Sequence, residues 1–280
     1  MLLRRQCPLL SVADGDTIKI EWEGKPRLVR LMDVDPESAG VGGSKPTTDF
    51  GRRTLLWARQ IVFDGVEAVE IEFPGDEVEL SNCGALLGYV HVHGENYNVR
   101  LVREGWSLCF DKYGAPRIHR AAMEQAELWA RAEGRGLWGG LGGRGDYRVS
   151  KSYFRVRAGQ VEAFRHAAAM GEDILSSRLH YHDIVARARA GTGAHVFAEI
   201  SRSFFQPDGA ITFQLGSPRQ PLEAVFPRSA VPLARFLERE FAGFGKPNYL
   251  YFSGRLAFDG ERPQILIERL DQVRTYPTRS

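Results

Sequence analysis

Five carboxylates and one arginine gather near the start of the chain, at the ends of two strand-like segments. They are Asp14, Asp16, Arg30, Asp33, Asp35 and Glu37. Clustered carboxylate oxygens suit a hard cation such as Ca²⁺. An arginine fork pairs two phosphate oxygens, and a further glutamate can orient or deprotonate a water. Together these groups meet the requirements of phosphodiester hydrolysis. A turn is the alternative explanation for Asp14-Gly15, because Asp-Gly is itself a turn signal.

A hairpin would position these side chains. Its two strands are predicted from "TIKIEW" and "RLVRLMDV", which alternate apolar and polar residues as half-buried strands do. Glu23-Gly24 lies between them and predicts the turn. Pairing through this turn would bring residues 14–17 close to residues 30–35.

The rest of the first half predicts a small barrel with a few helices. Two further strands are predicted from "EAVEIEF" and "LLGYVHVHG", the second ending in a tight turn at Gly94-Glu95. Helical spacing of apolar residues predicts helices over 48–62 and 118–134. Short strands with capping helices indicate an α+β, mainly β domain of the OB-fold type.

The second half repeats the strand theme after a glycine-rich segment. Residues 136–148 hold six glycines and predict a linker, so we expect domains at 1–145 and 146–280. Helices are predicted over 159–173 and 230–241. Strands are predicted within 182–200 (two, joined by Gly-Thr-Gly), 210–216, 222–227 and 248–268, the last a hairpin turning at Asp259-Gly260. This pattern predicts a second OB-like barrel.

Charge is distributed unevenly between the two halves of the chain, although the net charge is only +2. Residues 1–150 hold 19 Lys and Arg against 22 Asp and Glu, a net −3, and residues 151–280 hold 18 against 13, a net +5. A basic second half would attract nucleic acid. The three cysteines have irregular spacing and predict neither a disulfide framework nor a zinc motif.

The start of the chain and its hydropathy leave the location open. No apolar run approaches the roughly 18 residues that a membrane span needs. The first residues are too short for a signal peptide and run into the first strand. The protein is therefore expected to be cytoplasmic, or exported with a leader removed before this numbering; its oligomeric state is unknown.

The motifs of the first half resemble the staphylococcal-nuclease-like (thermonuclease) domain over about residues 9–138. The resemblance rests on "VADGDTIKI", "VRLMDVDPE", "LLGYVHVHGENYNVRLVREGW" and "AAMEQAELWARAEGRGLW", in that order. It implies an OB-fold barrel with Ca²⁺-dependent nuclease activity on DNA or RNA.

The resemblance also implies roles for individual residues. Asp16 and Asp35 match the two calcium-binding aspartates, Arg30 matches the first catalytic arginine, and Glu37 matches the glutamate that activates water. One residue that the family has between the second aspartate and Pro-Glu is missing here. Either Glu37 comes one residue early, or Asp33 takes over part of the metal site. A shift of about an ångström can cost 10²-fold in rate.

A second departure removes a cation. Ala85 stands where the family has its second catalytic arginine, and Cys83 where it has a tyrosine. Loss of such an arginine can cost roughly 10³–10⁵ in rate. Candidate substitutes are Arg52, Arg53, Lys112 and Arg117, although a solvated surface charge is the favoured interpretation of each.

Two further positions bear on ligands. Tyr113, beside Lys112, matches the family's second tyrosine at the nucleotide pocket and could stack on a base. His91 and His93 alternate on one strand and suggest a metal, but the sequence shows no third ligand near them. Ordinary strand residues are the alternative explanation.

The second half resembles accessory OB-fold domains that bind nucleic acid, over about residues 180–275. The resemblance rests on "ARARAGTGAHVFAEI" and "LYFSGRLAFDGERPQILIERLDQV". Arginines interleave with phenylalanines here, at Arg187, Arg189, Phe197, Arg202, Phe204, Phe205, Arg255, Phe258 and Arg262.

Three functions are compatible with these patterns. The preferred one is a metal-dependent nuclease acting on DNA or RNA, with single strands favoured. The alternative is a pseudonuclease that binds nucleic acid without turnover. A protein-interaction barrel is a third interpretation, which leaves Asp16, Arg30 and Glu37 unexplained.

Overall fold

The computed structural model describes residues 3–40, 47–76, 78–81, 84–112, 114–143, 147–216, 220–242 and 246–277. Within it the chain divides into two compact units, Met1–Phe154 and Arg155–Ser280. Among the described residues, no helix combines the length and apolar character needed to cross a bilayer.

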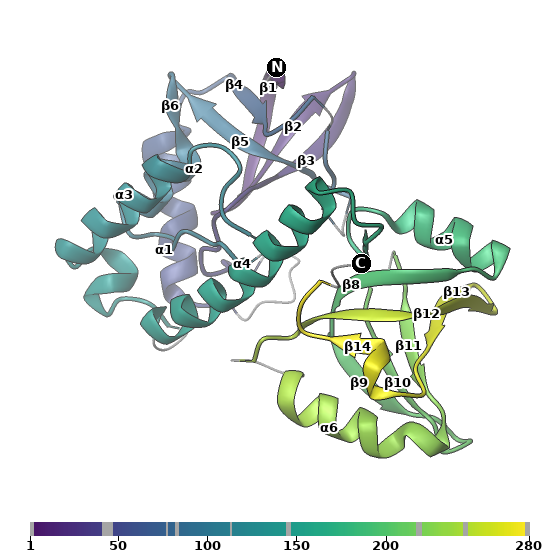
Figure 1. Ribbon diagram of the computed structural model, residues 1–280. Coiled ribbons are helices and arrows are strands. Elements are labelled where there is room, and N and C mark those ends of the chain that lie inside the picture. The colour runs from purple at the N-terminus through teal and green to yellow at the C-terminus, as the bar shows by residue number, and fades with distance from the viewer. Residues whose placement is uncertain are drawn as a thin grey trace. The chain divides into compact units, whose positions relative to one another are not determined.

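The first unit combines a barrel with helices, as the sequence predicts (Figure 1). Its strands are β1 (Leu3–Asp14), β2 (Thr17–Trp22), β3 (Lys25–Leu31), β4 (Ala68–Phe73), β5 (Leu86–Val92) and β6 (Glu95–Asn96). Its helices are α1 (Asp49–Trp57), which continues as a π-helical turn (Ala58–Val62), α2 (Tyr97–Arg103), α3 (Arg120–Ala132) and a 3₁₀ turn (Gly136–Gly139). The strand predictions, and the helices predicted over 48–62 and 118–134, are confirmed.

Five of these strands close into a barrel. The sheet order is β3-β2-β1-β4-β5, and a parallel pairing of β3 with β5 joins its two ends. Strand β1 serves two neighbours, because its first half pairs with β4 and its second half with β2, where bulges let it bend. The barrel interior is filled by fully buried side chains, among them Ile18, Ile20, Val29, Ile71 and Val90.

The described parts of the segment predicted as a linker contain helical structure. After the 3₁₀ turn, helix α4 begins at Tyr147 and runs to Ala169, so it starts well before the helix predicted at 159. The division between the two compact units falls inside this helix. Its first turns pack on the first unit, where Lys151 is buried and lies 3.0 Å from Asp111.

The second unit is an open mixed sheet with helices. Its strands are β7 (Leu175–Ser176), β8 (Gly193–Glu199), β9 (Arg202–Phe205), β10 (Ile211–Gln214), β11 (Glu223–Phe226), β12 (Tyr249–Asp259), β13 (Arg262–Leu266) and β14 (Val273–Arg274). Its helices are α5 (Tyr181–Ala190), α6 (Val231–Phe241) and 3₁₀ turns at Arg228–Ala230 and Leu270–Gln272. The predicted helix over 230–241 and the hairpin over 248–268 are confirmed.

The predicted second barrel is not found. The strands run in the order β7-β8-β12-β13-β11-β10-β9, and within the described ranges no pairing joins β9 back to β7. Two pairings in this path are parallel, β7 with β8 and β11 with β13. The sheet is therefore open, and the prediction of a second OB-like barrel is wrong.

The first strand predicted within 182–200 is also wrong, because residues 181–190 form helix α5. The alternation in "VARARA" suggested a strand, but alanine and arginine favour helix. Ile184 and Ala188 are four residues apart and both buried, and Gly191 follows at φ 63° as a helix stop. Arg187 bonds Asp173 and holds the last turn in place.

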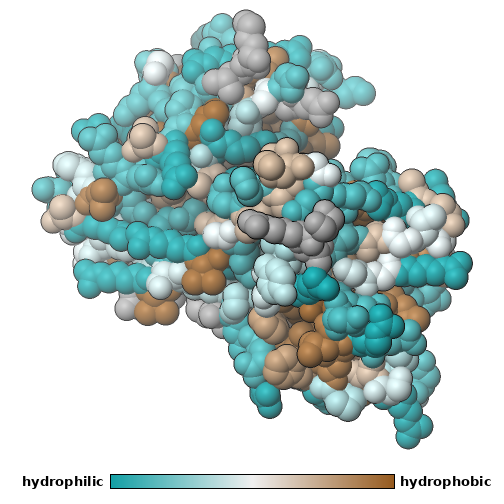
Figure 2. Space-filling model, viewed as in Figure 1, coloured by the Kyte–Doolittle hydropathy of each residue, from teal (hydrophilic) through white to brown (hydrophobic). Residues whose placement is uncertain are grey.

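The surface of the second unit carries an apolar patch over α6 and β14 (Figure 2). A shallow groove there is lined by side chains that include Phe236, Leu270 and Tyr276, which are exposed. The rest of the visible face is mostly hydrophilic.

Candidate nuclease site

The β2–β3 hairpin brings Asp16 and Arg30 together. Its turn, Glu23-Gly24, has positive φ at both residues (53° and 72°), the conformation of a two-residue hairpin turn. This register pairs Thr17 with Arg30. Arg30 Nη2 lies 2.7 Å from Asp16 Oδ2, so the predicted proximity of residues 14–17 and 30–35 is confirmed for this pair.

Asp16 is held in a defined orientation. Its side chain is buried, and Oδ1 accepts a hydrogen bond of 2.7 Å from the Thr17 hydroxyl. The phenol of Tyr97 donates to the Gly15 carbonyl at 2.9 Å and fixes the preceding backbone. Burial, together with Asp16 and Asp14, raises the pKa of Tyr97, so this phenol stays a donor. The side chain of Arg30 is 41% exposed and reaches solvent.

The two aspartates after β3 are placed differently. Asp33 sits at φ 58°, and its carboxylate accepts a hydrogen bond from the phenol of Tyr89 on β5. Asp35 is half-buried, and its backbone N–H donates to the Ser107 hydroxyl at 2.8 Å. Asp33 therefore has a partner of its own on the barrel wall.

Glu37 lies in a closed environment. Its side chain is 1% exposed. It accepts hydrogen bonds from the Thr48 hydroxyl, from the Gly143 backbone N–H at 2.7 Å, and from the Tyr147 phenol. A Cβ on Gly143 would stand only 3.2 Å from Glu37 Oε2, so the absence of a side chain allows this approach. Thr48 also caps α1 by accepting from the Gly51 N–H. Glu37 thus ties the start of α1 to the segment that leads into α4.

The position of the missing arginine is buried. Ala85 is 8% exposed, and its N–H donates to the Ser81 hydroxyl in a short turn before β5. Cys83 lies outside the described residues. Among the substitutes, Arg52 pairs with Asp49 at 2.6 Å, and Arg53 lies over the Phe50 ring.

Arg117 is the substitute that pairs with the segment just before the Ala85 turn. It forms an ion pair with Glu79, whose carbonyl accepts from Leu87 N–H in β5. Leu87 is in turn the residue that pairs with Arg30 across β3 and β5. Arg117 is therefore linked to the strand that lies beside Arg30.

The predicted nucleotide-pocket residues are only partly visible. Lys112 is half-buried on the loop before α3. Tyr113 lies outside the described residues, so its role stays a prediction.

Carboxylates and histidines meet elsewhere on the barrel. Across the parts of the chain that the structure describes, one group of three His, Cys, Asp or Glu side chains has ligand atoms all within 4.8 Å of one another, and it is Glu72, His91 and His119. The aspartates of the hairpin therefore do not form a three-carboxylate cluster with Glu37. Of these three residues, the sequence pattern indicated only His91. Glu72 and His119 could not be found from the sequence, because they are far apart along the chain and no local spacing relates them.

A closed five-strand barrel with capping helices is the architecture of an OB-fold domain, and its β2–β3 hairpin pairs an acidic residue with an arginine. A sequence model described as "Staphylococcal nuclease homologue" matches residues 28–140. Thermonuclease of Staphylococcus intermedius is 31% identical over 129 residues, which cover 45% of this chain and 72% of that protein. Micrococcal nuclease of Shigella flexneri is 27% identical over 140 residues, 46% of this chain and 71% of the relative.

The chain therefore belongs to the family of staphylococcal nuclease homologues, a family of phosphodiester-hydrolysing nucleases. The family match stops at residue 140 and does not extend into the second unit.

Proposed function

We propose that the first unit is a slow, Ca²⁺-dependent nuclease that hydrolyses phosphodiester bonds of DNA or RNA. The observation that carries this proposal is the Asp16–Arg30 pair, a buried carboxylate beside a guanidinium that reaches solvent. An acidic ligand in the turn before β2 and a phosphate-binding fork on β3 are two of the three groups that the reaction needs.

The donor atoms of this site suit calcium. Asp16, Asp35 and the Thr17 hydroxyl offer oxygen only, which a hard cation prefers. They supply fewer than the roughly six to eight oxygens that Ca²⁺ takes, so water and the substrate phosphate would complete the shell. Bound there, Ca²⁺ would neutralise charge on the phosphate. Binding should accordingly be weak without a nucleotide and tighter with one.

The arginines would hold the phosphate. Arg30 can exchange Asp16 for phosphate oxygens, because its side chain is partly exposed and its fork matches two oxygens. We assign the second cation to Arg117, through its ion pair at the turn that carries Ala85. A single arginine plus a more distant one is a weaker clamp than two aimed at the same oxygens.

Glu37 would be the residue that makes this enzyme slow. A general base must reach the water it activates, but the carboxylate of Glu37 is buried and accepts hydrogen bonds from three donors. Water could gain access when the Gly143 and Tyr147 hydrogen bonds open. The cleavage rate would then be proportional to the fraction of molecules in that opened state.

A pseudonuclease is the second candidate, and two observations favour it. The burial of Glu37 and the alanine at position 85 each remove one catalytic group from the surface. Under this alternative the same hairpin binds phosphate without turnover.

The second unit would add nucleic-acid affinity. Phe204 and Phe205 on β9 are 47% and 61% exposed, and the Arg235 guanidinium lies 4.2 Å from the Phe205 ring centre. Exposed aromatic rings beside cations are the surfaces on which single-stranded bases stack. Phe197 is buried in the core instead, and Arg187 and Arg262 are paired with Asp173 and Glu223.

The decisive experiment compares cleavage of single-stranded and duplex substrates with Ca²⁺ and with EDTA. Wild type, Glu37→Gln and Asp16→Asn are compared with Glu95→Gln, an exposed carboxylate on the same barrel. We expect slow, Ca²⁺-dependent cleavage by wild type and Glu95→Gln that is lost in the other two, with circular dichroism confirming that each variant is folded. Nucleic-acid binding without any cleavage by wild type would leave the pseudonuclease.

A further inference from the structure

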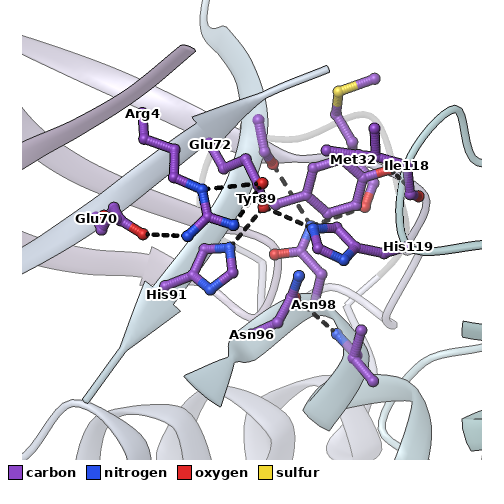
Figure 3. Close-up of polar contacts among 12 residues, drawn as sticks. Arg4, Met32, Glu70, Glu72, Tyr89, His91, Asn96, Asn98, Ile118 and His119 are labelled. Carbon is purple, nitrogen blue, oxygen red and sulfur yellow. Dashed lines mark hydrogen bonds and ion pairs between the residues drawn. The ribbon is translucent and has the colours of Figure 1, made fainter. Parts of the chain in front are cut away.

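Three side chains from separate parts of the first unit converge on one point of the barrel wall (Figure 3). Glu72 lies on β4, His91 on the neighbouring β5, and His119 immediately before α3. Glu72 Oε2 lies 2.8 Å from His91 Nε2 and 2.6 Å from His119 Nε2. His91 is thus the strand histidine that the sequence singled out, and the fold supplies the partners that the sequence did not show.

From this geometry we propose that Glu72, His91 and His119 form a binding site for a divalent transition-metal ion, with Zn²⁺ the best match. Two imidazole nitrogens and one carboxylate oxygen are a ligand set that zinc accepts, with water at the remaining position. This site is separate from the oxygen-only site at Asp16, and the proposal does not depend on nuclease activity.

The spacing of the ligand atoms requires only a small adjustment. Bonds of about 2.0–2.2 Å to a tetrahedral ion place ligand atoms about 3.3–3.5 Å apart. The two contacts of Glu72 Oε2, now 2.8 and 2.6 Å, would lengthen by about 0.5–0.9 Å to meet this requirement. All three ligand atoms already lie within 4.8 Å of one another.

A guanidinium orients the carboxylate. Arg4 donates to Glu72 Oε1 through Nε at 3.0 Å and Nη2 at 2.7 Å, which leaves Oε2 directed at both imidazoles. Such outer hydrogen bonds commonly fix metal ligands. Arg4 also pairs with Glu70 at 3.0 Å, so its positive charge is shared between two carboxylates. With neutral histidines, Arg4, Glu70 and Glu72 carry one net negative charge, which favours a cation.

The histidines are also oriented, and one of them provides a route for entry. The His119 ring packs edge-on against Tyr89 with ring centres 5.0 Å apart. His119 stands at φ 58°, a left-handed conformation that histidine visits more readily than most residues. The side chain of Glu72 is fully buried and that of His91 nearly so, but 24% of the His119 side chain is exposed. An ion can therefore reach the cluster from the side of His119.

A hydrogen-bonded network without metal is the competing explanation. In that network each ring N–H donates to Glu72. Metal binding requires the Nε2 lone pairs, so each ring proton must move to Nδ1 or to solvent.

The test is titration of the EDTA-stripped full-length protein with Zn²⁺ by calorimetry and with Co²⁺ by visible absorption. We expect one tight site whose Co²⁺ spectrum indicates four- or five-coordination with nitrogen ligands. His91→Gln and His119→Gln should each weaken binding by at least about 100-fold. Loss of a hydrogen-bond partner outside the metal's own ligands can already cost about 100-fold, and these variants remove a ligand itself. His93→Asn is the matched control, because His93 is on the same hairpin but exposed. It should bind like wild type.

Several results would overturn the proposal. Equal Zn²⁺ affinity of wild type and His119→Gln would do so, since that variant changes the most exposed ligand and should fold. A Co²⁺ spectrum of a six-coordinate, all-oxygen ion in wild type would also do so and needs no variant. Displacement of bound Co²⁺ by a modest excess of Ca²⁺ would point to the acidic hairpin instead.

Discussion

Glu37 and Arg30 are the two charged groups on which turnover would depend under the proposed function, and their surroundings differ sharply. Arg30 has 41% of its side chain in solvent and pairs with Asp16. Glu37 is buried, and three donors surround its carboxylate. We therefore expect Arg30 to be accessible to a phosphate in the folded protein as it stands, whereas activation of water by Glu37 would require a local opening.

A first prediction concerns the second cation. Arg117→Ala should reduce Ca²⁺-dependent cleavage by up to about 100-fold, the low end of the cost of removing a donor aimed at developing charge, because Arg117 is the more distant cation. Arg52→Ala, which breaks an exposed pair with Asp49, should change the rate little. Ala85→Arg in the Arg117→Ala background should recover part of the loss. Single-turnover rates measure these effects, and equal rates for the two alanine variants would refute the assignment.

A second prediction follows from Glu72. Burial alone would raise its pKa, but hydrogen bonds from His119, His91 and Arg4 outweigh burial and hold the pKa below the ordinary 4.5. The folded state thus binds this proton more weakly than the unfolded state. The carboxylate therefore contributes stability above its ordinary pKa, and that contribution is lost as the pH falls through the lowered value.

Glu72→Gln should remove this acid-sensitive contribution. Between about pH 5 and pH 3, the free energy of unfolding should fall less steeply in Glu72→Gln than in wild type. Urea unfolding with EDTA present measures both slopes. The expectation fails if the two slopes coincide.

Gly143 and the first turn of helix α4 both bind Glu37. Gly143 supplies a backbone N–H and Tyr147, in the first turn of α4, supplies a phenol, and both donate to Glu37. The start of α4 is thereby joined to the N-terminus of α1 through a buried carboxylate and Thr48.

Tyr147→Phe tests this connection. It leaves a buried carboxylate short of one donor, so the free energy of unfolding should drop by about 1–3 kcal/mol. The same loss should favour the opened state and raise the cleavage rate. Tyr276→Phe, at an exposed position, should alter neither quantity. A destabilised Tyr147→Phe with an unchanged rate would mean that Glu37 has a structural role alone.

Helices and strands could be predicted from local sequence patterns wherever those patterns fit one type of secondary structure and not the other. The β2–β3 hairpin and its Glu23-Gly24 turn could be predicted because alternation and turn chemistry agree there. Helix α5 could not be predicted, because "VARARA" fits both the two-residue period of a strand and the 3.6-residue period of a helix. Only the burial of Ile184 and Ala188 distinguishes the two. The open second sheet and the partners of Glu72 depend on contacts between distant segments, which no local pattern encodes.

At the scale of the whole molecule, the charge difference between the halves should govern binding. The acidic first half carries −3 and the basic second half +5, by the counts given above. Phosphates bound by the second unit would release counterions, so affinity should fall steeply with salt.

Removing cations beside the exposed phenylalanines should reduce that salt dependence. For Arg202→Gln combined with Arg235→Gln, we expect the slope of log K against log salt to become shallower by about one to two, for single-stranded substrates. Arg269→Gln, an exposed arginine paired with Asp271, is the control. Fluorescence anisotropy over a salt series measures the slopes, and an unchanged slope would exclude β9 and α6 as the binding surface.

The alternation of side chains along β2 and β3 has a consequence for how the gene can vary in length. A longer loop can replace the Glu23-Gly24 turn, but one codon inserted in β3 between the turn and Arg30 would reverse the faces and turn Arg30 into the barrel interior. The missing residue before Pro36 lies in irregular backbone, where a deletion changes reach but reverses no face. Among natural variants, length changes should therefore be absent from β2 and β3 and tolerated after Asp35.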